Sequence, residues 1–176
     1  MDSGGGFFAD AFVGGTWQRD TSGGVDRRHS PHSSVEVSIA ALCGEEEALA
    51  ARRYAATAAR QIRSQPAYRR AETLERAADA LVERRDELAR LETNELGKPI
   101  KDTTHEVMRA AETLQIAAAE ARRIGGEVLP TDGWPSGHGS SAMAIRLPVG
   151  VVLAITPFNA PVNLLAHKLA DRKSVV

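Results

Sequence analysis

The chain has little cysteine and no long apolar run. Cys43 is the only cysteine among its 176 residues, so no disulfide can form within one chain, which is compatible with a reducing cytoplasm. The longest apolar run, residues 149–155, has the length of a strand and is far shorter than the ~20 residues of a membrane-spanning helix. The amino terminus lacks the basic and then apolar regions of a secretory signal. We therefore expect a cytoplasmic protein without a membrane partner.

An excess of charge of one sign is also absent. The 22 lysines and arginines face 23 aspartates and glutamates, so the chain has no global attraction for nucleic acid or an anionic membrane. The arginines of residues 67–95 alternate with glutamates, which is typical of a solvent-exposed helix face with ion pairs. His29 and His32 have a spacing that could bind a metal, but Pro31 lies between them and no carboxylate or thiol clusters nearby. We expect no nucleic-acid partner and no metal site.

Apolar spacing predicts strands, then helices, then strands. The expected elements, in chain order, are a strand at residues 35–39, helices at 45–64, 66–97 and 103–124, strands at 143–147 and 151–155, and the first turns of a helix at 163–170. Gly97 is the expected C-cap of the second helix. Residues 151–155 are continuously apolar, as expected of a parallel strand that is covered on both faces. Three helices followed by strands do not suit a helical bundle, since the last strands need sheet partners.

Two helices have apolar faces that predict their packing. In the second helix, leucines and one alanine recur at spacings of three, four and seven, at Leu74, Ala78, Leu81, Leu88 and Leu91. In the third helix the stripe is narrow and rich in alanine, at Val107, Ala111, Leu114, Ala118 and Ala121. A stripe of small residues allows a close approach, so we expect the third helix to pack tightly on a neighbour.

The first 34 residues are rich in glycine, serine and charge. They form either a mobile tail or a short ribbon packed on the body through Phe12 and Trp17. We divide the chain into this tail or ribbon at residues 1–34, a main part at residues 35–170, and a short end at residues 171–176.

The most informative stretch is residues 148–161, Pro-Val-Gly-Val-Val-Leu-Ala-Ile-Thr-Pro-Phe-Asn-Ala-Pro. A predicted buried strand runs directly into a loop in which Pro157 and Pro161 fix the backbone. Asn159 lies between these prolines, where its side-chain amide can meet a ligand.

This stretch resembles the Pro-Val-Gly-Val run of the NAD(P)-dependent aldehyde dehydrogenase superfamily, which ends in Pro-[Trp/Phe]-Asn-x-Pro. The resemblance covers residues 12–170 and includes further pieces in the family's order, namely Phe12-Val-Gly-Gly-Thr-Trp, Tyr68-Arg-Arg-Ala, Glu95-Leu-Gly-Lys-Pro-Ile, Glu106-Val-Met-Arg-Ala, Gly125-Gly-Glu and His167-Lys-Leu-Ala. Each piece alone is weak evidence, but their order and spacing make a chance match improbable. The implied fold class is α/β, with N-terminal helices and the first strands of a nucleotide-binding domain that is incomplete here.

The resemblance also implies a reaction and a set of site residues. Members of this family oxidise an aldehyde to a carboxylic acid with NAD or NADP, through a cysteine thiohemiacetal and thioester, and a glutamate activates water. Asn159 matches the asparagine whose amide holds the oxyanion. The stretch that lies along the cofactor is matched by Ile155, Thr156, Pro157 and Phe158. The expected partners are a small-molecule aldehyde and, in the complete enzyme, further copies of the same chain.

The family's nucleophilic cysteine, its glutamate base and its glycine-rich turn would all follow residue 170. Cys43 lies where the family has no chemistry, and we expect it to be a small buried residue. We therefore expect an N-terminal fragment that is inactive alone.

The resemblance stops at residue 170. Residues 171–176 have the sequence that is obtained when the first bases of a common sequencing-library adapter are translated. We expect these six residues to be non-native. The alternative is a gene that is truly truncated or frameshifted.

A second class of function stays open from the residues themselves. The chain could be a helical interaction or structural domain without catalysis, in which Asn159 is an ordinary loop residue. A buried strand that ends in Pro-Phe-Asn favours the enzyme, because an interaction domain does not need one.

Overall fold

A computed structural model describes residues 7–175 of the chain, with the side chains of residues 7–170. The side chains of the predicted non-native end, residues 171–176, lie outside this described part. The strands are β1 (Phe7–Ala9), β2 (Ala11–Val13), β3 (Thr16–Gln18), β4 (Val25–His29), β5 (Glu36–Ala41), β6 (Gly126–Leu129) and β7 (Ala142–Ile145). The helices are α1 (Glu45–Arg63), α2 (Ala67–Glu83), α3 (Arg85–Leu96), α4 (Ile100–Arg123), the 3-10 turn η1 (Pro135–Gly137) and α5 (Pro161–Val175).

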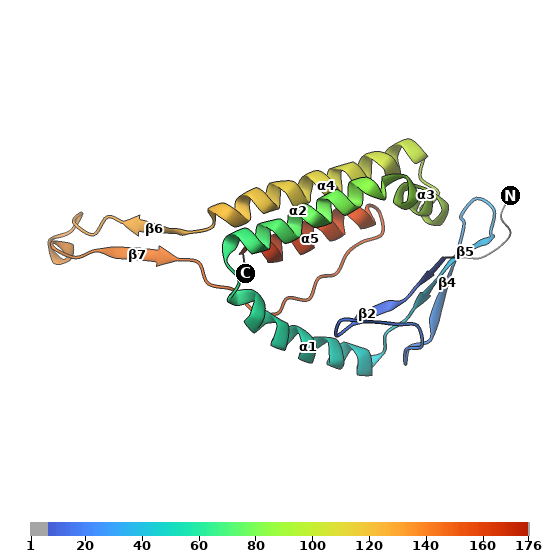
Figure 1. Cartoon of the computed structure of the whole chain (residues 1–176), viewed down its shortest axis with the longest axis horizontal. Helices are drawn as coiled ribbons and strands as arrows, with labels where there is room; N and C mark the ends of the chain where they lie inside the picture. Colours follow the sequence, from blue (N-terminus) through green and yellow to red (C-terminus); the bar gives the residue numbers. More distant parts are fainter. Residues whose placement is uncertain (1–6, 176) are drawn as a thin grey trace.

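The strands form three small sheets beside a layer of helices (Figure 1). β5 is the central strand of the first sheet, in which β1 pairs with it in parallel and β4 in antiparallel orientation. β2 and β3 form a hairpin whose turn residues Gly14 and Gly15 both have positive φ, as tight hairpin turns require. The mixed α/β architecture agrees with the predicted fold class.

The apolar residues of the hairpin do not pack as expected. Phe12 and Trp17 face each other across β2 and β3, with ring centroids 4.8 Å apart. Both stay exposed, at 58% and 70% of their surface, whereas Val13 is buried. The prediction that Phe12 and Trp17 pack the ribbon on the body is therefore wrong. Strand alternation explains the difference, because Val13 points to the opposite face from Phe12.

Helix α1 begins at Glu45 and ends at Arg63, close to the predicted bounds. Glu47 accepts hydrogen bonds from the backbone amides of Ser22 and Gly44, at 2.9 and 2.8 Å, and from the Ser22 hydroxyl. These bonds lower the pKa of Glu47 to about 2. They fix the start of α1 to the loop before β4, although none of the α1 side chains is buried.

The second predicted helix is two helices. The chain bends at Arg84, where φ is −98° and ψ is 15°, and α3 begins at the next residue. The apolar spacing continues across this bend, with Leu81 and Leu88 seven residues apart, so the pattern gives no sign of it. The bend turns α3 toward the first turns of α4 and toward β5 (Figure 1). Gly97 ends α3 in the left-handed conformation with φ of 71°, as expected of the C-cap.

The core lies between α2, α4 and α5 and is built from small residues. Its buried members are Ala71, Leu74, Ala78, Ala110, Ala111, Leu114, Ala118, Ala121, Ala166 and Ala170. The whole predicted stripe of the third helix is buried, which confirms the close packing expected of α4.

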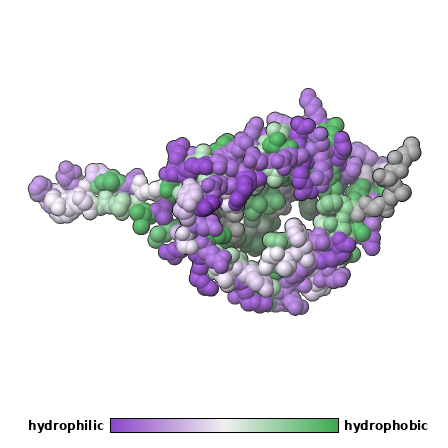
Figure 2. Space-filling view, in the orientation of Figure 1, coloured by the Kyte–Doolittle hydropathy of each residue, from purple (hydrophilic) through white to green (hydrophobic). Residues whose placement is uncertain are grey.

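The strand predicted at residues 151–155 does not form. Residues 151–157 have no regular secondary structure, and Leu153 and Ile155 are 84% and 76% exposed. A parallel strand needs partners on its edges and layers on its faces, and the described residues supply neither. Apolar side chains gather in a hollow between the helical layer and the part of the chain that holds α1 and β2 (Figure 2).

Strands β6 and β7 pair as an antiparallel hairpin that projects away from the helices (Figure 1). The hairpin exposes Val128, Met143 and Ile145. Across the described residues, none of the helices is long and apolar enough to cross a membrane.

Candidate functional site

The loop that precedes α5 carries all five predicted site residues. Ile155, Pro157, Phe158 and Asn159 are exposed and Thr156 is half-buried. Residues 158–160 turn into α5, whose first residue is Pro161, a position where the missing N–H of proline costs nothing. Among residues 7–170, the hydrogen bond found for Asn159 is that of its backbone oxygen with Lys98 Nζ, so its exposed side-chain amide is free to bind a ligand.

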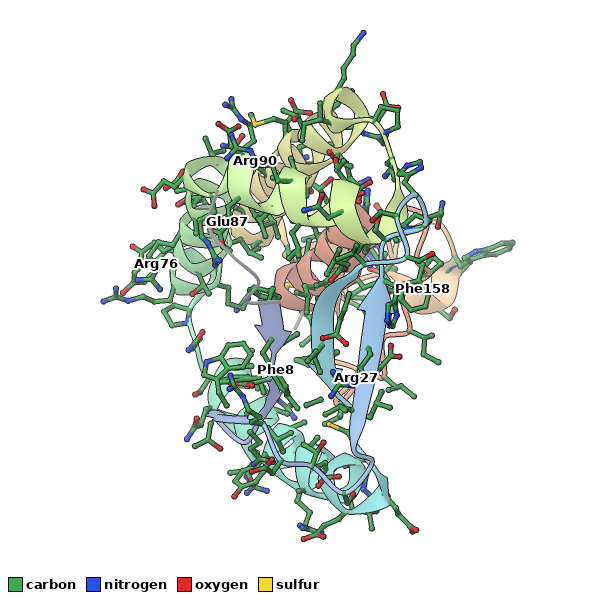
Figure 3. All side chains as sticks on the ribbon, turned by 90° about the vertical axis from the view of Figure 1, so that its right-hand side faces the viewer. Phe8, Arg27, Arg76, Glu87, Arg90 and Phe158 are labelled. Carbon is green, nitrogen blue, oxygen red and sulfur yellow. The ribbon has the colours of Figure 1, made fainter. Side chains whose placement is uncertain are left out.

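Phe158 is held from the sheet side of the molecule. The guanidinium carbon of Arg28, in β4, lies 4.7 Å from the centre of the Phe158 ring, within the range of a cation–π interaction. Figure 3 shows Phe158 beside the strands β4 and β5. This contact joins the loop before α5 to the N-terminal sheet, although the two are far apart in the sequence.

Behind Asn159 lies a group of charged side chains from α3, the short turn after it and α4, which we call the Lys98 cluster: Glu92, Lys98 and Glu106. The Lys98 Nζ atom is 2.6 Å from Glu92 Oε1 and also contacts Glu106 Oε2. The same Nζ atom donates a hydrogen bond of 3.3 Å to the backbone oxygen of Asn159. Glu92 and Glu106 are 4% and 7% exposed, so the cluster is largely shielded from water.

One cation shared by two buried carboxylates shifts all three pKa values. Burial and the neighbouring carboxylate of Glu106 raise the pKa of Glu92 to about 7. Burial also opposes the charge of Glu106, but its interactions with Glu92 and Lys98 and the hydrogen bond from the Asn163 amide outweigh burial and lower the pKa of Glu106. For Lys98 the two carboxylates likewise outweigh burial and raise the pKa. Near neutral pH, Glu92 is therefore the group of the cluster that gains or loses a proton.

A hollow of about 260 Å³ opens beside the cluster and the start of α5. Its lining combines both charge signs with small side chains, from Lys98, Asp102, His105, Glu106, Arg109, Ala160 and Asn163. Asn159 itself does not line the hollow, which reaches the start of α5 at Ala160 and Asn163.

Sequence reasoning did not assign a role to the Lys98 cluster. The motifs that contain Lys98 and Glu106 were recognised only as parts of a resemblance. One signal was available in the pattern of α4, because Glu106 lies between Thr103 and Val107, which are both fully buried. A carboxylate at a buried position needs a partner, and that requirement points to a nearby cation.

The other candidates from the sequence have no site around them. Cys43 is exposed in the loop from β5 to α1, so the expectation that it is buried is wrong, because this loop leaves its side chain uncovered. His32 is bound to the backbone oxygen of Gly97 through its Nε2 atom, at 3.1 Å. No group of three or more potential metal ligands occurs among the described residues.

Comparison with known proteins decides the family. Residues 17–172 match the sequence profile of the aldehyde dehydrogenase family. The chain belongs to the aldehyde dehydrogenase family. It is 38% identical over 159 residues to a 3-sulfolactaldehyde dehydrogenase of Priestia megaterium, a match that covers 90% of this chain and 32% of that protein. Over 162 residues it is 33% identical to the NADP-dependent glyceraldehyde-3-phosphate dehydrogenase of Pisum sativum, covering 90% of this chain and 33% of that enzyme.

Solved structures of aldehyde dehydrogenases have the same fold. The NADP-dependent glyceraldehyde-3-phosphate dehydrogenase of Bacillus halodurans, complexed with NADP, superposes with a TM-score of 0.90 at 34% identity, covering 96% of this chain and 36% of that one. Aldehyde dehydrogenase 21 of Physcomitrella patens, complexed with its product succinate, superposes with a TM-score of 0.91 at 30% identity, covering 97% and 35%. This aldehyde dehydrogenase chain thus spans about a third of the length of its relatives and corresponds to their N-terminal third.

Proposed function

We propose that this chain is the N-terminal part of an enzyme that oxidises a small aldehyde to a carboxylic acid with NAD or NADP. In that enzyme a cysteine thiolate from the remaining two thirds adds to the aldehyde, giving a thiohemiacetal and then a thioester. The observation that carries the proposal is the free amide of Asn159, presented at the start of α5 inside a chain of this family.

Asn159 is proposed to donate its amide N–H to the aldehyde oxygen as that oxygen becomes negative. A neutral amide suits this task because it stabilises a developing charge without permanently attracting other anions. Removal of one such donor typically costs about 3–4 kcal/mol in the transition state. The short loop between Pro157 and Pro161 supports the role, because it limits how far the amide can move.

Residues 155–158 are proposed to lie along the cofactor, which would accept the hydride that the aldehyde loses. The residues fit the flat face of a ring better than a phosphate, because the strip consists of Ile155, Thr156, Pro157 and Phe158 and itself contains no cation. Ile155 and Phe158 are 76% and 63% exposed, so their apolar surface is available for such a contact. They would exclude water from one side of the reacting carbon.

We also propose that the complete enzyme is a homo-oligomer. Support comes from the β6–β7 hairpin, which projects from the helices and exposes Val128, Met143 and Ile145. Exposed apolar residues on a projecting hairpin suit a contact with another copy of the chain.

The decisive experiment uses the complete enzyme with Asn159→Ala. We expect kcat and kcat/KM to fall together by roughly 10²–10³, with KM little changed, provided that chemistry limits turnover. Asn159→Asp should be at least as harmful, because a carboxylate repels the oxyanion. Asn94→Ala, at an exposed position of α3, is the matched control and should leave both constants unchanged. Single-turnover hydride transfer within about threefold of the parent enzyme would remove Asn159 from the mechanism.

The 176-residue chain alone should not oxidise aldehydes. Its only cysteine, Cys43, lies in the loop from β5 to α1, so the thiolate that the reaction needs is missing. Reduction of NAD or NADP by the purified chain, above a control without enzyme and abolished by Asn159→Ala, would contradict this.

A further inference from the structure

The backbone around Asn159 is held by two side chains of the Lys98 cluster. On one side, Lys98 Nζ donates to the backbone oxygen of Asn159 itself, at 3.3 Å. On the other side, Glu106 Oε1 accepts from the backbone amides of Val162 and Asn163, at 3.1 and 3.3 Å. The end of the loop that carries the free amide and the first turn of α5 are thus fixed by Lys98, which precedes α4, and by Glu106 of α4.

Helix α5 needs an acceptor from outside its own sequence. The first helical hydrogen bond runs from the Leu164 amide to the Ala160 oxygen, at 2.9 Å, so Ala160 occupies the N-cap position. An alanine side chain cannot accept the free amides of the first turn, as serine, threonine, aspartate or asparagine would. Glu106 replaces the missing cap, and its negative charge also suits the positive end of the helix.

Lys98 completes the arrangement. An ammonium group has three donors, and those of Lys98 meet three acceptors: Glu92, Glu106 and the Asn159 oxygen. Lys98 follows Gly97, whose left-handed backbone ends α3 and directs the chain into α4. All three donors of Lys98 therefore have acceptors, and one of these acceptors is the backbone oxygen of Asn159, the residue proposed to stabilise the oxyanion.

We propose that Lys98 and Glu106 are positioning residues, which hold the Asn159 loop and the first turn of α5 so that the Asn159 amide points at the reacting oxygen. The inference rests on the proposed role of Asn159. Neither residue touches the substrate in this scheme, and both act through the backbone of residues 159–163.

The first test uses the 176-residue chain and needs no catalysis. Amide hydrogen exchange is measured at Val162 and Asn163 by mass spectrometry with electron-transfer fragmentation, at submicromolar concentration to limit association, with Leu114 in the core as the internal reference. In Glu106→Ala, exchange at Val162 and Asn163 should accelerate at least tenfold while Leu114 stays unchanged. The control is Glu120→Ala, an exposed glutamate of the same helix that pairs with Arg123, and it should change none of the three. Unchanged exchange at Val162 and Asn163 in Glu106→Ala overturns the proposal, as does an equal rise at all three amides, which would mean a general structural role.

The second test uses the complete enzyme and separates positioning from stability. Lys98→Met should lower kcat by roughly 10- to 100-fold, as small misplacements of a catalytic group do, with KM within about threefold. Lys98→Arg, which keeps the charge and the donors, should recover most of the loss. If Lys98→Met does not fold, Glu106→Gln, which has the same shape as the parent, replaces it.

A double mutant decides whether the loss passes through Asn159. Combined with Asn159→Ala, Lys98→Met should cost nothing further in kcat, because a misplaced amide no longer matters once the amide is gone. Full additivity of the two losses would overturn the positioning role. A harmless Asn159→Ala would instead refute the proposed function, and the exchange result would still report on the loop, so the two failures can be told apart.

Discussion

At the scale of single residues, the Lys98 cluster has one cation for two buried carboxylates. Ionisation of both carboxyl groups costs free energy here, because burial disfavours the charged forms and two like charges lie close together. Burial and the neighbouring Glu106 raise the pKa of Glu92 to about 7, whereas that of Glu106 is lowered. Glu92 Oε2 is also buried without a hydrogen-bond partner among the described residues. Glu92 is therefore the member that the fold tolerates best in its protonated form.

This asymmetry predicts how the stability of the chain depends on pH. The pKa of Glu92 in the folded chain lies above its ordinary value of 4.5. Its contribution to the free energy of unfolding is therefore fully present below pH 4.5 and is lost as the pH rises to about 7. For Glu106 the shift is downward, so its contribution is lost only below pH 4.5. Between pH 5 and 8, Glu92→Gln should therefore flatten the stability profile and add about 1–3 kcal/mol at pH 8.

Urea unfolding followed by circular dichroism measures this prediction. Glu87→Gln is the matched control, since Glu87 lies on the same helix α3 but is exposed and pairs with Arg84. It should keep the slope of the parent chain between pH 5 and 7. A Glu92→Gln chain with the parent slope, or one that is less stable at pH 8, would show that Glu92 is ionised in the fold.

At the scale of elements, α4 is held by close contact of small side chains. Ala110, Ala118 and Ala121 of α4 are buried against α2 and α5, and interiors of this kind have no room for added methyl groups. Ala118→Leu should therefore destabilise the chain by about 1–3 kcal/mol through overpacking. Ala119→Leu, at the exposed neighbouring position, adds the same atoms and should leave the stability within about 0.5 kcal/mol. The two midpoints of urea unfolding would coincide if the helices were loosely packed.

The helices and their faces were predictable because their signals are local. Apolar residues three and four apart located the stripe of α4, and Gly97 located the end of α3. The bend at Arg84 was not predictable, since neither glycine nor proline marks it and the leucine spacing continues through it. The chain bends there because α3 packs on α4 and β5, which is a tertiary cause.

The strand and the site depended on information from outside the local pattern. Residues 151–155 carry the pattern of a buried strand, but a strand forms only beside partners, and residues 151–157 stay irregular. The loop with Asn159 was recognisable from its prolines and its motif. The Lys98 cluster was harder to recognise, because the buried position of Glu106 is the one local signal, and the packing of α3 on α4 decides which cation it meets.

At the scale of the whole molecule, the chain contains a core but leaves a large apolar surface uncovered. The α2–α4–α5 core is complete, whereas residues 149–158 and the hollow of Figure 2 expose apolar side chains. The chain corresponds to about a third of the length of its relatives.

We predict that the isolated chain associates at micromolar concentration. Val149, Leu153 and Ile155 are each more than three-quarters exposed and lie in a segment without strand partners among the described residues, a combination that favours pairing between chains. Light scattering coupled to gel filtration should show a mass that rises with concentration. Replacement of Leu153 and Ile155 by glutamate should lower that mass, because like charges then oppose the pairing of two such segments.

The control replaces an apolar residue outside this segment. Val82 is 42% exposed on α2, and Val82→Glu should leave the association as it is in the parent chain. The comparison matters because any added charge raises solubility to some extent, whereas a specific effect of residues 153 and 155 identifies the unpaired segment as the cause. A chain that stays monomeric over this concentration range and unfolds in one sharp transition would contradict the prediction, because it would mean that the apolar side chains of residues 149–158 do not drive association in water.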